Sequence, residues 1–209
     1  TYFWVCTYNF YYFGGLKISF TKTFINNLFF PALMVFLSIV ITISVLALLF
    51  AGYLTRDVLK RDTGTAAMQE VSNAIKIGAE AFLKRQYTTI AIMSIALAVI
   101  IYIAYAFFGN ATLGWRTSVS FIFGAISSGI AGIVGMWISI RANIRTASAA
   151  RKSMNDAFVT AFRGGAVSGI VIVAMSLLGV GLIYYVFSIG VEPKEVPFLI
   201  VGYGFGASF

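Results

Sequence analysis

Four long stretches of this sequence contain no Asp, Glu, Lys or Arg. They are Thr23–Thr55, Gln86–Trp115, Thr117–Ile140 and Gly164–Val191, with lengths of 33, 30, 24 and 28 residues. Roughly 20 helical residues cross a hydrocarbon core about 30 Å thick, so each stretch is long enough to span a bilayer. A transmembrane barrel would need strands in which polar and apolar residues alternate, and segments such as Ile95–Ile103 do not alternate. The stretches therefore predict membrane-spanning helices.

Composition supports the same interpretation. Only 11% of the residues are charged, 60% are hydrophobic, and the mean hydropathy is +0.92. A soluble domain has about 25% charged residues, so this chain lacks the polar surface that a water-exposed globule requires. We expect an all-α integral membrane protein, a polytopic helix bundle with four complete transmembrane helices near 31–54, 87–108, 117–140 and 164–188. The start of a fifth is expected at 197–209.

Residues 1–30 differ from the remainder, residues 31–209, which we treat as one region. Eight of the first thirteen residues are aromatic: Tyr2, Phe3, Trp4, Tyr8, Phe10, Tyr11, Tyr12 and Phe13. The stretch lacks the basic beginning of a signal peptide. It is either an aromatic belt at the membrane interface or a segment foreign to the native protein, and we assign no function to it.

Basic residues gather in two of the predicted connections, which hold eleven of the fifteen in the chain. Between the first two spans lie Arg56, Lys60, Arg61, Lys76, Lys84 and Arg85. Between the third and fourth lie Arg141, Arg145, Arg151, Lys152 and Arg163. The positive-inside rule places both connections in the cytoplasm and the N-terminus outside. The net charge of +8 is thereby explained without a nucleic-acid partner.

The first basic connection has a helical pattern of its own. Within Asp62–Gln86, apolar residues recur at near-helical spacing: Met68, Val71, Ile75, Phe82 and Leu83. No turn signal separates this pattern from the second span at Tyr87. We therefore favour a helical extension of the span into the cytoplasm over a helix that lies on the membrane surface.

The available side chains limit the chemistry. There is no histidine, and Cys6 is the only cysteine, so neither a disulfide framework nor a cysteine or histidine metal cage is expected. The pairs Asp57 and Asp62, and Glu70 and Glu80, are spaced so that their members face different sides of a helix. The spans carry no charge at mid-membrane depth, where charges usually mark ion pathways. No two carboxylates are therefore expected to form an acid–base or metal-binding pair, and the spans are not expected to form an ion pathway by themselves.

Small and basic residues form the remaining motifs. Small residues recur at four-residue spacing in two sets: Gly124, Ser128 and Gly132, and Ala161, Gly165 and Gly169. This spacing predicts close helix packing rather than a polar path through the membrane. The glycines of Gly202–Gly206 lack dinucleotide-binding spacing and predict another closely packed helix. Arg141, Arg145 and Lys152 are predicted to share one face of a helix that leaves the third span. We favour cytoplasmic anchors over phosphate ligands for them.

Separated blocks of the sequence, in the same order, resemble the membrane-bound, ion-pumping pyrophosphatases. The blocks are Met68–Val71, Ile77–Ile90, Gly132–Met136, Arg141–Ala147, Ala161–Gly169 and Gly202–Ser208. The resemblance implies a homodimer with sixteen spans per subunit that hydrolyses inorganic pyrophosphate in the cytoplasm and pumps protons, or sodium in some members. It also implies Mg²⁺ bound between the substrate and several aspartates on later helices.

Those aspartates are expected beyond Phe209. The resemblance therefore implies that these 209 residues hold no catalytic, substrate-binding or metal-binding residue and are an inactive N-terminal scaffold portion. The block around Arg85–Tyr87 is closer to the potassium-independent, proton-pumping members. The expected location is the inner membrane of a prokaryote or an acidic organelle membrane of a eukaryote. Expected partners are membrane lipid, pyrophosphate and a second copy of the chain.

Two other classes of protein stay open at this point. One is a non-enzymatic secondary transporter or assembly subunit, which the absence of intramembrane charges disfavours. The other is a basic membrane adaptor that recruits phosphorylated lipids through its eleven cytoplasmic cations. Only the pump accounts for the ordered blocks.

Overall fold

The computed structural model of the chain describes residues 11–13, 16–18, 30–187 and 196–209. The chain divides into two units, Thr1–Val40 and Ile41–Phe209, which are described separately. In the first unit, strands β1 (Tyr11–Phe13) and β2 (Leu16–Ile18) form an antiparallel hairpin. The aromatic composition of residues 1–30 did not predict this hairpin, and most of that stretch lies outside the described residues.

The rest of the described chain is helical: α2 (Phe30–Leu59), α3 (Ala66–Phe107), α4 (Ala111–Ala150), α5 (Met154–Phe187) and α6 (Val196–Ala207). Of the helices described, four are long and apolar enough to cross a membrane, and α6 is a shorter apolar helix. The predicted fold class, a polytopic helical integral membrane protein, is confirmed. Helix α3 continues without a break from Ala66 through the second span, which confirms the predicted helical extension.

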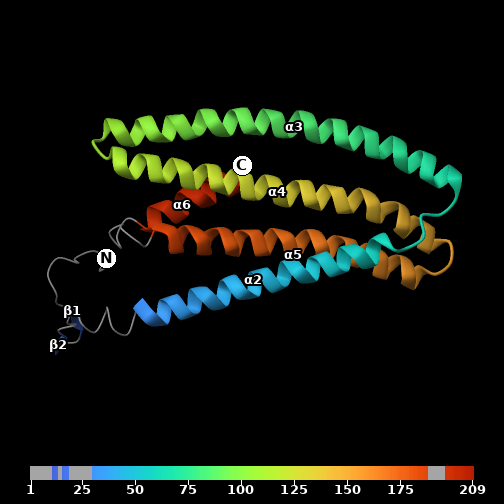
Figure 1. Ribbon diagram of the computed structural model, residues 1–209, viewed down its shortest axis with the longest axis horizontal. Coiled ribbons are helices and arrows are strands. Elements are labelled where there is room, and N and C mark those ends of the chain that lie inside the picture. Colours follow the sequence, from blue (N-terminus) through green and yellow to red (C-terminus); the bar gives the residue numbers. More distant parts are fainter. Residues whose placement is uncertain (1–10, 14–15, 19–29, 188–195) are drawn as a thin grey trace. The chain divides into compact units, whose positions relative to one another are not determined.

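Two glycines make the turns at the ends of α3. Gly64 has φ 76° and Gly109 has φ 80°, values that only glycine adopts without steric cost. After Gly64, Thr65 caps α3, because its hydroxyl accepts a hydrogen bond from the Met68 N–H. These two turns reverse the chain, so α3 runs antiparallel to its neighbours within the second unit (Figure 1).

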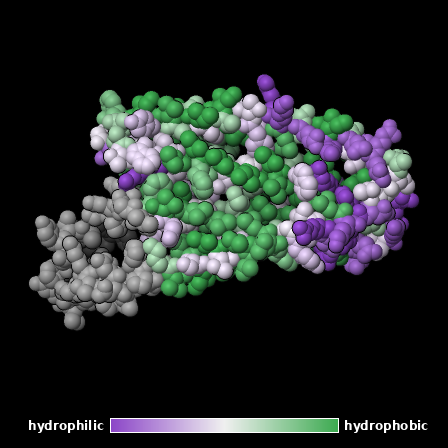
Figure 2. All heavy atoms as spheres, in the orientation of Figure 1, coloured by the Kyte–Doolittle hydropathy of each residue, from purple (hydrophilic) through white to green (hydrophobic). Residues whose placement is uncertain are grey.

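Both basic connections lie at the same end of the second unit, as predicted. Figure 1 shows the α2–α3 and α4–α5 connections at one end and the α3–α4 connection at the other. In Figure 2, hydrophobic residues cover the middle of the helices, and hydrophilic residues gather over the two basic connections. This distribution matches an apolar zone within a membrane and a charged zone outside it.

Helix α4 is the centre of the second unit, since α3, α5 and α6 all contact it. A core near the basic end joins Val58 of α2, Ile138 of α4 and Val167 of α5, each at most 1% exposed. A second core at α6 contains Leu199 and Tyr203, likewise buried. Many large apolar side chains elsewhere are exposed, as expected of helices whose outer faces meet lipid.

Candidate functional site

The polar end of the bundle contains an ion-pair cluster that joins α2 to α5. Near the end of α2, Oδ2 of Asp57 lies 2.5 Å from Nη1 of Arg163 on α5 and 3.5 Å from Nη2 of Arg61. Arg61 also donates a 2.7 Å hydrogen bond to the hydroxyl of Thr160, which is fully buried. That hydroxyl in turn donates to the Asp156 carbonyl at 2.6 Å. One carboxylate and one hydroxyl thus fix two arginines between the helices.

A second cluster joins the α2–α3 connection to the end of α4. Asp62 accepts hydrogen bonds from the Gly64 N–H at 3.1 Å and from the Ser148 hydroxyl at 3.0 Å. Lys152 Nζ lies 3.4 Å from the same carboxylate. Arg145 of α4 donates from Nε and Nη2 to the Leu59 carbonyl at 3.3 and 3.1 Å. This last contact satisfies a carbonyl at the C-terminus of α2, the end at which positive charge is favourable.

The contacts of Asp62 change its titration. The Gly64 N–H, followed by the Ser148 hydroxyl and Lys152, holds the pKa of this carboxyl below its ordinary value of 3.8. Because the folded-state pKa is depressed, the stabilisation from these contacts is complete above the ordinary value. It is lost as the pH falls through the lowered pKa. The Asp62 carboxylate therefore stays ionised throughout the neutral range, and its contacts weaken as the pH falls into the acid range.

Both clusters consist of ion pairs and hydrogen bonds between helix ends. Each carboxylate is engaged by cations, and the described part of the chain holds no group of three His, Cys, Asp or Glu side chains placed to bind a metal ion. A cavity of about 190 Å³ beside the second cluster is lined by Arg61, Asp62, Arg145, Ser148, Lys152 and Asp156, with charges of both signs. The arrangement fixes helix ends relative to one another.

The three cations predicted to share a helix face are only partly so arranged. Arg141 and Arg145 both lie on α4 and line one polar cavity. The prediction is wrong for Lys152, because α4 ends at Ala150 and Lys152 lies in the following turn. From the turn it reaches Asp62, whereas Arg145 reaches α2. Sequence spacing alone placed the helix end too late.

The predicted packing of small residues is confirmed for α4 and α6. A Cβ at Gly124 would collide with the Tyr203 carbonyl oxygen of α6, and one at Gly206 would collide with the Phe121 carbonyl oxygen of α4. A Cβ at Gly202 would lie 3.0 Å from the Thr117 carbonyl oxygen. The two backbones therefore approach closely at several successive turns. In the same way, Gly132 accommodates the Tyr87 hydroxyl of α3.

The packing predicted for Ala161, Gly165 and Gly169 is not found in this chain. All three are exposed, and a Cβ at Gly165 or Gly169 would meet nothing within 4 Å. The neighbouring Gly164 makes the contact instead, with the Cβ of Ala142 2.6 Å from where its own would stand. A shift of one residue turns the contact face by about 100° around the helix. The spacing was correct, but the face was wrong.

Sequence reasoning also missed the contacts that form the two clusters. Asp57 and Asp62 were given no role, although the four-residue spacing of Asp57 and Arg61 was a visible signal for an ion pair. The partner Arg163 had no such signal, since 106 residues separate it from Asp57. Glu80 pairs with Lys76 at 3.8 Å on the exposed side of α3. Glu192 and Glu195 lie outside the described residues.

Comparison with known proteins gives a consistent result. The family model described as inorganic H⁺ pyrophosphatase matches residues 45–209. The chain is 47% identical over 165 residues to a K(+)-insensitive pyrophosphate-energized proton pump of Moorella thermoacetica, covering 79% of this chain and 23% of the pump. It is 39% identical over 189 residues to pyrophosphate-energized membrane proton pump 3 of Arabidopsis thaliana, covering 81% and 24%. It thus spans about a quarter of the length of these relatives and belongs to the inorganic H⁺ pyrophosphatase family.

Proposed function

We propose that this chain is the N-terminal scaffold portion of a primary pump that couples the hydrolysis of inorganic pyrophosphate to proton transport. The observation that carries the proposal is the match of residues 45–209 to the family, with relatives named as pyrophosphate-energized proton pumps. The scaffold role follows from the structure's chemistry. Asp57 and Asp62 near the basic end are engaged by cations, and the long uncharged runs carry no Asp, Glu, Lys or Arg that could mark an ion path.

Magnesium, which the family resemblance implies, does not fit the residues described. Asp57 is held by two arginines and Asp62 by a lysine, and an Mg²⁺ ion binds carboxylates that face it without a competing cation. We therefore do not place the metal ligands of the proposed pump at Asp57 or Asp62, and the described part of the chain holds no group of three His, Cys, Asp or Glu side chains that could bind a metal ion. Relatives from Moorella thermoacetica and Methanosarcina mazei are named K(+)-insensitive, which supports potassium independence for this pump too. A homodimer is part of the same proposal.

A chimera tests the proposed function. The matching quarter of the Moorella thermoacetica pump is replaced by residues 45–209 of this chain. We expect the purified chimera, in sealed vesicles, to hydrolyse pyrophosphate and to acidify the lumen. The 209-residue chain alone should release phosphate only at the background rate, because its described part holds no metal cluster.

Two controls make the outcome decisive. The Moorella thermoacetica pump provides the positive signal, and the same pump without its matching quarter shows that the exchanged part is required. A chimera that inserts into the membrane at wild-type levels but neither hydrolyses nor pumps would contradict the proposal. Mg²⁺-dependent hydrolysis by the 209-residue chain alone would contradict the scaffold role.

A further inference from the structure

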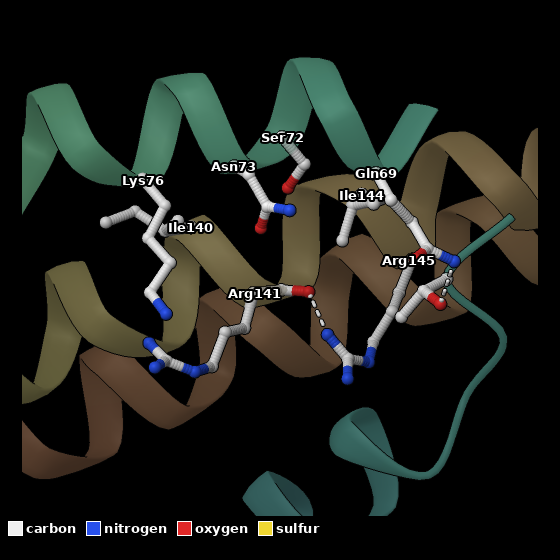
Figure 3. A pocket seen from close by; sticks show the side chains of 9 residues that line it. Gln69, Ser72, Asn73, Lys76, Ile140, Arg141, Ile144 and Arg145 are labelled. Atoms are coloured by element: carbon white, nitrogen blue, oxygen red, sulfur yellow. Dashed lines mark hydrogen bonds between the residues drawn. The ribbon is translucent and has the colours of Figure 1, made fainter. Parts of the chain in front are cut away.

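A polar cavity between α3 and α4 lies next to the second cluster and shares Arg145 with it. It has a volume of about 200 Å³ and is lined by Gln69, Ser72, Asn73, Lys76, Arg141 and Arg145, among other residues. Three of these side chains are cations, and none of the residues lining the cavity is acidic. Figure 3 shows Lys76 of α3 and Arg141 of α4 pointing toward one another across it. Like charges that face one another repel, so this arrangement favours an anion between them.

The two arginines have no carboxylate of their own among the described residues, since no such group lies within 4.0 Å of either. Arg145 donates hydrogen bonds to the Leu59 and Arg141 carbonyls, which fix its position without neutralising its charge. Arg141 lies over the Trp137 ring at 4.1 Å and donates one hydrogen bond to the Trp137 carbonyl. Among the described residues, the ion pair of Lys76 is the exposed, 3.8 Å contact to Glu80, which contributes little. The cavity therefore keeps a net positive charge.

The remaining lining residues suit an oxyanion. Asn73 and Ser72 project amide and hydroxyl groups from α3 toward the cavity (Figure 3), and such groups donate hydrogen bonds to phosphate oxygens. A water molecule occupies about 30 Å³ in the liquid, so a cavity of 200 Å³ holds a phosphate group together with hydrating water. The charge of the cavity, its hydrogen-bond donors and its volume all suit a phosphate group.

Two sources of the phosphate are chemically equivalent at this cavity. Arg141 immediately follows the uncharged run Thr117–Ile140, so on α4 the cavity begins where the apolar part of the helix ends. A neighbouring cavity of about 530 Å³ is mostly apolar and shares Ser72, Ile140 and Ile144 with the polar one. A lipid headgroup therefore fits the location. A free phosphate ion is also negatively charged and also offers phosphate oxygens as acceptors.

We propose that the cavity between Lys76 and Arg141 is a binding site for a phosphate group, supplied by an anionic lipid or by a free phosphate ion. The proposal is independent of the pumping activity, because it concerns a cavity that holds no catalytic group. It assigns a ligand-binding role to Arg141, which the sequence analysis interpreted as a cytoplasmic anchor, and to Lys76, to which it gave no role.

Binding to the detergent-solubilised 209-residue chain tests the proposal in two arms. One arm titrates a short-chain phosphatidic acid, with a short-chain phosphatidylcholine as the neutral lipid control, and the other titrates inorganic phosphate. Lys76→Gln and Arg141→Gln should each weaken binding about tenfold, the usual effect of removing a charge-assisted hydrogen bond. Lys84→Gln and Arg151→Gln remove the same charges from α3 and from the α4–α5 turn outside the cavity, and should change binding less than twofold.

The outcomes separate the sources and the site. A specific loss in the lipid arm identifies a lipid headgroup, and a specific loss in the phosphate arm identifies a free ion; both support the site. No binding in either arm, or equal weakening by the control variants, overturns it. Helix content measured by circular dichroism checks the fold of each variant. If a glutamine variant fails to fold, the charge-preserving Lys76→Arg and Arg141→Lys variants replace it, and both are expected to bind phosphate. Loss of binding in both of these variants overturns the proposed site.

Discussion

Replacing Gly206 by leucine is expected to separate α6 from α4 and to destabilise the protein by about 2–3 kcal/mol. A Cβ at this position collides with the Phe121 carbonyl oxygen and lies 2.9 Å from the Ala125 nitrogen. Both are backbone atoms of a long helix, so they cannot rotate away as a side chain would. Overpacking of this kind costs about 1–3 kcal/mol and sometimes more. In lipid, close packing is the main force between helices, which places the cost at the upper end.

Hydrogen exchange measures the separation directly. The amides of Gly202–Ala207 should lose protection in Gly206→Leu, and Tyr203 should lose its hydrogen bond to the Met175 carbonyl of α5. Gly204→Leu is the matched control, because it lies on the same helix and a Cβ there meets nothing within 4 Å. Equal exchange and equal stability in the two variants would show that α6 does not pack on α4 through Gly206.

Removing the carboxylate of Asp57 is expected to loosen the contact between the end of α2 and α5. The Asp57→Ala variant leaves Arg61 and Arg163 without their common partner. The side chains are 26–40% exposed, so solvent screens the interaction, and we expect a loss of about 1 kcal/mol. Repulsion between the two released arginines adds to the effect. Reversible unfolding of the purified protein measures it.

A double-mutant cycle isolates the pair. The variants Asp57→Asn, Arg163→Gln and their combination should give a coupling free energy of about 1 kcal/mol, with the double variant more stable than the sum of the single losses predicts. The exposed pair of Lys76 and Glu80, treated in the same way, is the control and should couple by only about 0.3–0.5 kcal/mol. Additive effects of the Asp57 and Arg163 changes would mean that the ion pair does not join the helices.

The helices could be predicted from the sequence because one physical constraint dominates them. Backbone groups in lipid must bond within the segment, so an uncharged run of sufficient length has to be helical. The runs Thr23–Thr55 and Gly164–Val191 therefore located α2 and α5 without any homologue. Both basic connections fall at one end because two membrane-spanning helices lie between them along the chain.

The contacts between the helices could not be predicted to the same extent. Four-residue spacing of small residues identifies a face that can pack, but α5 has such residues on more than one face. The chain uses Gly164 and leaves Gly165 and Gly169 exposed. The pairing of Asp57 with Arg163 likewise depends on how α2 and α5 meet, which no local pattern records. The polar cavity needed both α3 and α4 in place before Lys76 and Arg141 could be seen to face one another.

The direction of insertion is the central claim, because it places both clusters and the proposed phosphate site in the cytoplasm. Labelling with a membrane-impermeant maleimide tests it in a Cys6→Ser background, since Cys6 is the only native cysteine. Ser153→Cys reports on the α4–α5 connection and Asn110→Cys on the α3–α4 connection. We predict labelling of Asn110→Cys in intact cells, and of Ser153→Cys only after permeabilisation. Labelling of Ser153→Cys in intact cells, with Asn110→Cys protected, would contradict the account.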